Sequence, residues 1–423
     1  MEFLHAADLH IDSPLRGLDR YEGAPVDRLR NATRAALVRL VDAALAQRVD
    51  FVLLAGDIFD RDWQDFHTGL FFREQMVRLD RGGVRVFMIQ GNHDAQGVIT
   101  RQLPWPGNVT VFSSRRPETH RLDPLQVAIH GRSFPDRAVE EDWVPDYPDP
   151  VPGYFNIGLL HTSLGGRPGH DRYAPTDAST LAARGYDYWA LGHVHAREVV
   201  REAPWIVFPG NLQGRHANET GPKGCERVRV TPSGVEVEPL VLDEVRWHRL
   251  RVDLGGVEGI VPLGRCVTRT LASALPRGDE RLHAVRVTLA GSGEGLQALE
   301  ARTPGTLEAQ VRAAAQDLDG LDVWIERVEV DPSRPLDRDA AASRDDAVGE
   351  LVRQVDALLA EPGAAREWVE AQISGLRERL PAEVDIGLLD DLQDPERLRG
   401  VLQDAESTVL ARLEGGNGEE GCS

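Results

Sequence analysis

Short apolar runs that each end in a polar cluster constrain this chain more than any other feature of its sequence. Across residues 1–245 these runs alternate with longer stretches whose apolar residues recur at helical spacing. Such alternation is typical of an α/β domain. The expected strands are Phe3–Ala7, Phe51–Ala55, Val84–Ile89, Val127–His130, Phe155–Leu160, Tyr188–Leu191 and Ile206–Phe208, and the expected helices are Asn31–Gln47 and Phe66–Leu79.

The polar clusters at the ends of these runs share one chemistry, because they consist of aspartate, histidine and asparagine. They are Asp8-Leu9-His10, Gly56-Asp57-Ile58-Phe59-Asp60, Gly91-Asn92-His93-Asp94, His161 and Gly192-His193-Val194-His195. The carboxyl ends of strands in an α/β sheet converge on one edge, where ligands bind. We therefore expect clusters that lie far apart in the sequence to form one site.

Imidazole, carboxylate and amide oxygen together suit a borderline divalent cation such as manganese, iron or zinc. Two ions roughly 3.5–4 Å apart need a shared anionic ligand, and Asp57 in its tight Gly-Asp turn is well suited to that role. The three cysteines form no C-x-x-C pair, which argues against a disulfide framework and a cysteine-rich zinc site. Each cluster alone has a structural explanation, such as a turn or a helix cap, but all five together are hard to explain in that way.

The ordered set D-x-H, G-D-x-x-D, G-N-H-D, a strand-ending histidine and G-H-x-H resembles the calcineurin-like metallophosphoesterases. Within them, the segments AADLHIDSPL, AGDIFD, QGNHD and LGHVH resemble the SbcD-type DNA exonucleases, particularly the bacterial branch called YhaO. Residues 209–216 (PGNLQGRH) and 223–225 (KGC) resemble that branch too. The resemblance is strong over residues 1–245 and extends further only through the order of domains.

This resemblance implies the roles of the clustered residues. One metal ion would be held by Asp8, His10, Asp57 and His195, and the other by Asp57, Asn92, His161 and His193. His93 would face the scissile phosphate and protonate or steady the leaving oxygen, and Asp60 would orient His93. Some DNA-repair relatives have a histidine where this chain has Asp60. The implied cofactors are two manganese ions, with magnesium, iron or zinc as alternatives, and the implied reaction is in-line attack of a metal-activated hydroxide on a phosphodiester.

Three parts are expected along the chain. Residues 1–245 form the metallophosphoesterase nuclease domain, a two-sheet sandwich flanked by helices. Residues 246–330 form a small α/β capping domain, with strands at Leu250–Leu254, Ala284–Leu289 and Val323–Val330 and helices near 261–275 and 304–317. Residues 331–423 form an acidic helical region of net charge −12, whose tail after 415 we expect to be disordered.

The function predicted from these features is that of a DNA exonuclease in end processing and repair, with endonuclease activity left open. Two alternatives remain: a phosphatase or small-molecule phosphodiesterase with the same dinuclear core, and a catalytically weak DNA-end scaffold. The resemblance also implies an SbcC-like ATPase partner with long coiled coils, and a homodimer remains open. No basic stripe marks a nucleic-acid surface. Loop residues near the motifs that could contact phosphates are Arg16, Arg132, Arg167, Arg215 and His216, and of these Arg16, Arg215 and His216 are the predicted DNA contacts. Without a signal peptide or a membrane-spanning run, the chain is expected to be cytoplasmic.

Overall fold

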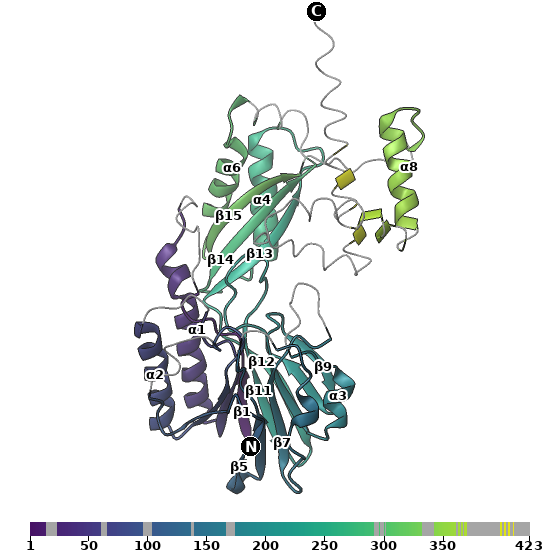
Figure 1. Ribbon diagram of the computed structural model, residues 1–423. Coiled ribbons are helices and arrows are strands. Elements are labelled where there is room, and N and C mark those ends of the chain that lie inside the picture. The colour runs from purple at the N-terminus through teal and green to yellow at the C-terminus, as the bar shows by residue number, and fades with distance from the viewer. Residues whose placement is uncertain are drawn as a thin grey trace, which may run out of the picture. The chain divides into compact units, whose positions relative to one another are not determined.

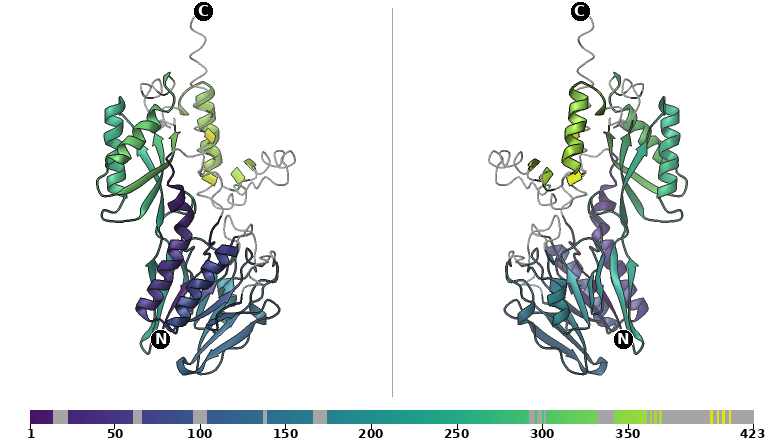
Figure 2. Two further views of the ribbon diagram at one scale, coloured as in Figure 1. Left: turned by 90° about the vertical axis from the view of Figure 1, so that its left-hand side faces the viewer. Right: turned by 90° about the vertical axis from the view of Figure 1, so that its right-hand side faces the viewer.

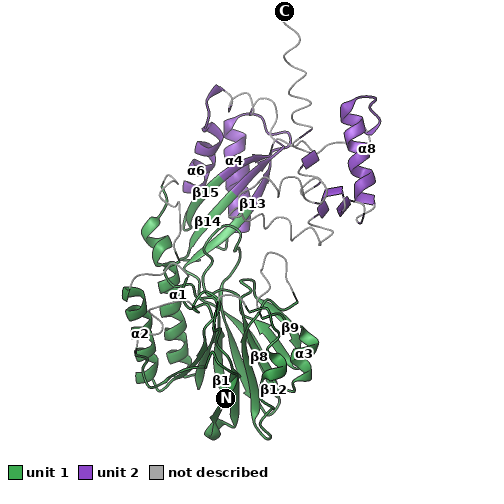
Figure 3. Cartoon of the chain, viewed as in Figure 1, with its two compact units in different colours: residues 1–249, 275–286, 318–327 green, residues 250–274, 287–317, 328–423 purple. Residues whose placement is uncertain are grey.

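The structure is a computed structural model (Figure 1). It describes residues 1–13, 23–60, 66–95, 104–136, 139–165, 174–291, 296, 300, 302–331, 342–360, 363, 365–366, 368–369, 398–399, 402, 405–406 and 409. These residues divide into two compact units (Figure 3). The first comprises 1–249, 275–286 and 318–327, and the second comprises 250–274, 287–317 and 328–423.

Two six-stranded sheets build the first unit. One has the order β12-β11-β1-β2-β3-β4 and the other the order β5-β6-β7-β8-β10-β9. The strands are β1 (Glu2–Ala6), β2 (Phe51–Ala55), β3 (Arg85–Ile89), β4 (Val109–Val111), β5 (Glu118–Leu122), β6 (Val127–Gly131), β7 (Phe155–His161), β8 (Tyr188–Gly192), β9 (Glu198–Glu202), β10 (Trp205–Phe208), β11 (Gly224–Thr231) and β12 (Gly234–Val241). In each sheet the central strands are parallel, namely β1, β2, β3 and β4 in one and β6, β7, β8 and β10 in the other, which places their carboxyl ends at one edge.

The inner faces of these sheets pack on each other as a sandwich. Phe3 of β1 stacks on Phe51 of β2, with ring centroids 4.9 Å apart, and meets the ring of Tyr188 of β8 edge to face at 5.5 Å. Because side chains alternate along a strand, Leu4 and Ala6 of β1 turn to the opposite face and join the core beneath the helices. Strand β2 is buried at all five residues, as expected where both faces of a sheet are covered.

Helices α1 (Val26–Gln47) and α2 (Phe66–Arg81) cover the outer face of the first sheet (Figure 2). Helix α1 begins five residues earlier than the sequence pattern indicated, directly after Pro25, and its C-cap residue Arg48 has the left-handed conformation. On the outer face of the second sheet, Trp189 packs against Tyr147 and against Leu181, which lies in the short helix α3 (Ala178–Ala183). The remaining short elements of this unit are η2 (Asp123–Leu125) and η3 (Val144–Asp146). The predicted fold class is therefore confirmed.

A three-stranded sheet of order β13-β14-β15 accounts for the strands predicted beyond residue 246. These strands are β13 (Val245–Asp253), β14 (Leu282–Ala290) and β15 (Asp322–Asp331). In the second unit, helices α4 (Ile260–Ala274) and α6 (Thr306–Gln316) pack against each other, and α8 (Ala347–Ala360) follows. The predicted boundaries at 245/246 and 330/331 stay a prediction, and the tail after 415 lies outside the described residues. Among the helices described, none is both long and apolar enough to cross a membrane.

Candidate metal centre

The loops that follow five parallel strands place the predicted site residues together. Asp8 and His10 follow β1, Asp57 and Asp60 follow β2, Asn92 and His93 follow β3, His161 ends β7, and His193 and His195 follow β8. Three groups of side chains bring their ligand atoms within 4.8 Å of one another. They are Asp8, His10 and His195; Asp57, His161 and His193; and His10, Asp60 and His93.

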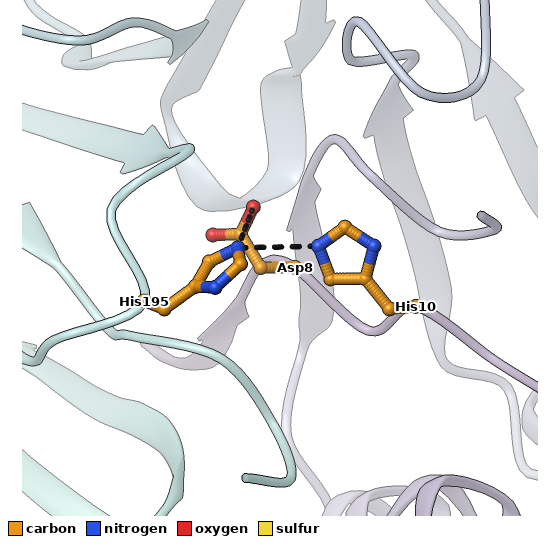
Figure 4. Close-up of side chains that lie close together, drawn as sticks. All are labelled: Asp8, His10 and His195. Carbon is orange, nitrogen blue, oxygen red and sulfur yellow. Dashed lines mark hydrogen bonds and ion pairs between the residues drawn. The ribbon is translucent and has the colours of Figure 1, made fainter. Parts of the chain in front are cut away.

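The first group combines one carboxylate with two imidazoles (Figure 4). The Nε2 atoms of His10 and His195 approach to 3.2 Å, and His195 Nε2 lies 3.9 Å from Asp8 Oδ1. Asp8 and His10 are almost fully buried. Burial, followed by the charge of Arg215, lowers the pKa of His10 well below its ordinary value, which keeps this ring neutral and its nitrogen lone pair free to bind a cation.

Asp57 belongs to the second group and also lies close to the first. His161 Nε2 lies 2.9 Å from Asn92 Oδ1 and 3.5 Å from Asp57 Oδ2. The rings of His161 and His193 meet edge to face at 5.2 Å. The same Asp57 Oδ2 lies 3.8 Å from His10 Nε2 of the first group. Asp57 therefore occupies the position between the groups that a shared anionic ligand requires.

Four of the predicted ligands have an unusual backbone conformation. Asp8, His10, Asp57 and His193 all have positive φ, at 52°, 42°, 51° and 100°. Such conformations cost on the order of 1–3 kcal/mol each and persist only where the surroundings fix them. Here they are fixed by hydrogen bonds between loops: the Asp8 carboxylate accepts the backbone N–H of His193, and the N–H of His10 donates to the carbonyl of Asp57 at 3.0 Å.

The hydrogen bonds of two histidines test whether the site suits a metal. Nδ1 of His161 donates to the carbonyl of Ala55 at 2.9 Å, and Nδ1 of His195 donates to Oε1 of Glu219 at 2.7 Å. In a neutral ring this leaves the lone pair on Nε2, which in both residues faces the predicted centre. The lone pair of His161 Nε2 then faces the oxygens of Asn92 and Asp57, with no hydrogen between them. A bound cation would accept electron pairs from all three atoms.

Without a metal ion, a proton on His161 takes that place. Burial lowers the pKa of His161, but the charge and hydrogen bond of Asp57 and the charge of Asp8 together outweigh burial and raise the pKa to about 9. Conversely, burial raises the pKa of Asp57, but the neighbouring histidines, His161 first among them, together outweigh burial and hold the pKa well below its ordinary value. The two residues thus form a strongly coupled pair whose proton a metal ion would displace.

His93 stands beside the predicted ligands rather than among them. Its Nδ1 lies 2.7 Å from Asp60 Oδ1, its Nε2 lies 4.0 Å from Asp57 Oδ2, and its side chain is 22% exposed. Burial raises the pKa of Asp60, but the hydrogen bonds from His93 and Ser13 and the charge of His10 together outweigh burial and lower it. Ser13 also donates to Asp60, and Arg215 lies 3.7 Å from it. Asp60 therefore stays charged and directs Nε2 of His93 toward the centre.

The residues predicted to contact DNA have different surroundings. The side chain of Arg215 is only 14% exposed and donates to Glu219, whereas that of His216 is 57% exposed. Arg16 lies outside the described residues. Contact of any of these three with DNA stays a prediction.

Two buried acids near the site were not assigned roles from the sequence. Asp94 accepts the backbone N–H groups of Ile58, Phe59 and Gly91, which ties the loop after β3 to the loop after β2. Burial, then the charge of Asp57, raises the pKa of Asp94 to about 7. Glu219, in the loop before β11, contacts His195 and Arg215. An isolated glutamate in a loop carries no periodicity or spacing that could reveal such a contact.

Comparison with known proteins defines the class. Residues 1–197 match the family model of the calcineurin-like phosphoesterases, and residues 247–333 match the middle domain of the metallophosphoesterase YhaO. The chain belongs to the calcineurin-like metallophosphoesterases, a family of hydrolases, and carries a YhaO-type middle domain. The resemblance found in the sequence motifs is thereby confirmed.

Individual members of this family, among them YhaO and Mre11 proteins, are similar to the chain. The chain is 37% identical over 296 residues to the uncharacterized metallophosphoesterase YhaO of Bacillus subtilis (strain 168), covering 69% of this chain and 72% of that one. It is 26% identical over 365 residues to the DNA double-strand break repair protein Mre11 of Haloferax volcanii, covering 83% of this chain and 74% of the relative. The match to Mre11 of Methanopyrus kandleri is 28% over 237 residues and spans about half of each, 50% of this chain and 48% of the relative.

Proposed function

We propose that this chain is a two-metal phosphodiesterase that acts on DNA ends. The observation that carries the proposal is the position of Asp57, whose carboxylate lies between two groups of histidine and acidic ligands and is flanked by the His93–Asp60 pair. DNA as the substrate is supported by the similarity to proteins named for DNA double-strand break repair, one of which aligns with 83% of this chain.

In this proposal the ligand sets follow the sequence prediction. Asp8, His10, Asp57 and His195 hold one ion, and Asp57, Asn92, His161 and His193 hold the other. When bound, such ions lower the pKa of a water molecule and neutralise the charge of the phosphate. Nitrogen and oxygen donors without sulfur suit manganese, with magnesium, iron or zinc as alternatives.

The protein's own groups supply positioning and proton transfer. Asp60 accepts a hydrogen bond from Nδ1 of His93 and thereby orients the ring. A proton at Nε2 then faces the centre, where His93 donates it to the leaving oxygen of the phosphodiester. Asp94 keeps the loop that carries Asn92 and His93 in register with the loop that carries Asp57, because it accepts N–H groups from both.

A phosphatase or small-molecule phosphodiesterase is the second candidate, since it would use the same centre. Such an enzyme needs little beyond the sandwich, whereas this chain adds the region that matches the YhaO middle domain. We assign that region, expected at 246–330, to orienting DNA, and the acidic region 331–423 to docking on a coiled-coil ATPase. A catalytically weak scaffold is the third candidate, and it is disfavoured because the predicted histidine and acidic ligands lie together with His93, and Asn92 lies 2.9 Å from His161 Nε2.

Manganese-dependent digestion of labelled DNA tests the proposal. Duplex, hairpin and single-stranded DNA are compared with a simple phosphomonoester, using Asp57→Ala as the inactive control. We expect cleavage of at least one DNA form that requires manganese and is absent in the control. Hydrolysis of the phosphomonoester alone would contradict the DNA assignment and favour a phosphatase.

A further inference from the structure

A single buried carboxylate, Glu219, contacts both the predicted metal ligand His195 and Arg215, which lies beside Asp60. Its side chain is 7% exposed. Oε1 accepts from Nδ1 of His195 at 2.7 Å and from Nη2 of Arg215 at 3.1 Å. Oε2 accepts from the backbone N–H of Arg215 at 2.7 Å and from Nδ2 of Asn211 at 3.0 Å. Glu219 thus binds a predicted metal ligand and the loop that carries Arg215.

The partners of Glu219 require a carboxylate at this position. Both oxygens face donors, and an ionised carboxylate has only acceptors to offer. A glutamine of the same shape would turn an amide N–H₂ group toward donors on one side or the other. It could keep the hydrogen bonds from His195 and Nη2 of Arg215, or those from Asn211 and the backbone N–H of Arg215, but not both sets. In either orientation the negative charge that strengthens the hydrogen bond from Nδ1 of His195 is lost.

The contact with His195 decides which ring nitrogen is available. A proton held at Nδ1 by Glu219 leaves the lone pair at Nε2, which lies 3.2 Å from His10 Nε2 and 3.9 Å from Asp8 Oδ1. Lys223 donates to the backbone carbonyl of His195 at 2.7 Å, which holds the backbone there but leaves the direction of the ring to Glu219. Loss of Glu219 would free the ring to rotate and to protonate at Nε2.

Through its contact with Arg215, Glu219 also influences the His93–Asp60 pair. With its guanidinium held by Glu219, Arg215 lies 3.7 Å from Asp60 Oδ2. Asp60 in turn holds His93. A chain of hydrogen bonds and ion pairs therefore joins His195 to His93 through Glu219, Arg215 and Asp60.

We propose that Glu219 is a positioning residue that presents Nε2 of His195 to the metal and holds Arg215 beside the His93–Asp60 pair. The inference rests on the proposed dinuclear centre. Removing a partner that orients a metal-binding histidine typically weakens metal affinity by about 10–100-fold. We expect a loss of this size at the ion held by Asp8, His10 and His195, and little change at the ion held by Asn92, His161 and His193.

Manganese titration of the full chain without substrate tests the inference. Isothermal titration calorimetry and the electron paramagnetic resonance spectrum are compared for wild type, Glu219→Gln and the control Glu326→Gln. Glu326 is a suitable control because it is also buried and doubly bound, by Arg286 at 2.7 and 2.8 Å, yet touches no predicted ligand. Wild type and the control should show two ions with a spin-coupled spectrum. Glu219→Gln should bind one ion weakly and show a single-ion spectrum at intermediate manganese.

Equal affinity for both ions in Glu219→Gln and wild type would overturn the inference. If that variant fails to fold, nitrogen-15 NMR of the wild-type histidines decides instead. His195 must be protonated at Nδ1 and bind the metal through Nε2, and the reverse tautomer would overturn the role of Glu219. Because these measurements use no nucleic acid, they stand apart from the nuclease proposal. A wild type that binds two ions but cleaves no DNA would end that proposal and leave this one intact.

Discussion

Replacing Gly91 with alanine is expected to abolish manganese binding, although Gly91 supplies no ligand atom. Gly91 precedes Asn92 and packs directly on two predicted ligands. A Cβ atom at this position would lie 2.2 Å from Asp57 Oδ1, 2.7 Å from Asp57 N and 2.9 Å from Cε1 of His161. Something must shift, and each neighbour is itself held in place.

The size of that shift decides the outcome. Ordinary contact begins at 3.4 Å, so the Asp57 carboxylate would have to move by about 1 Å. Metal–ligand distances tolerate only about ±0.2 Å. Asp57 also cannot move alone, because its Oδ1 accepts the backbone N–H of His93 at 2.9 Å. Overpacking of this kind typically costs about 1–3 kcal/mol of stability, which leaves the variant folded but its centre distorted.

The assay is manganese stoichiometry by elemental analysis after dialysis, with thermal unfolding of the metal-free protein alongside. Gly107→Ala is the matched control, because a Cβ there meets nothing within 4 Å. The control should bind two ions as wild type does. Two tightly bound ions in Gly91→Ala, in a protein that is otherwise folded, would refute the argument that Asp57 is a ligand fixed by this close contact.

Three further predictions follow from the same site and from the C-terminal region. Asp57→Ala should lose both manganese ions, because the bridging carboxylate serves both, and one ion still fully occupied in metal analysis would count against bridging. His93→Ala should keep both ions but lose about 10²–10⁴-fold of its cleavage rate. The loss of rate should be smaller with a nitrophenyl phosphodiester, whose leaving group needs no proton. Loss of metal from His93→Ala would show that His93 is a metal ligand and not the proton donor. Deleting residues 331–423, which carry net charge −12, should leave manganese binding intact and weaken association with a coiled-coil ATPase in a pull-down. Much weaker DNA binding by the folded truncated protein would instead make this region a DNA-binding element.

The periodic parts of the chain were predictable from the sequence. Phe3, Phe51 and Tyr188 lie in apolar runs of strand length, and the inward direction of Phe3 follows from alternation along β1. Because carboxyl ends of parallel strands converge, Asp57 and His161 could be assigned to one site although 104 residues separate them in the sequence.

Contacts that depend on the path of a loop were not predictable. Glu219 meets His195 only because the loop between β10 and β11 returns to the site, and no periodic pattern describes that loop. The same applies to the contacts of Arg215 with Asp60 and Glu219, whereas its predicted contact with DNA stays a prediction. The positive φ of Asp8 and His10 is likewise imposed by hydrogen bonds from other loops and not by residue type.

The most direct test of the proposed function is the rate of manganese-dependent cleavage of DNA measured against that of a simple phosphomonoester. The same protein preparation is used for both, before and after removal of metal by a chelator. We predict that duplex, hairpin or single-stranded DNA is cleaved, that the chelator abolishes cleavage, that added manganese restores it, and that the phosphomonoester is hydrolysed far more slowly. Efficient hydrolysis of the phosphomonoester with no cleavage of any DNA form would contradict the account.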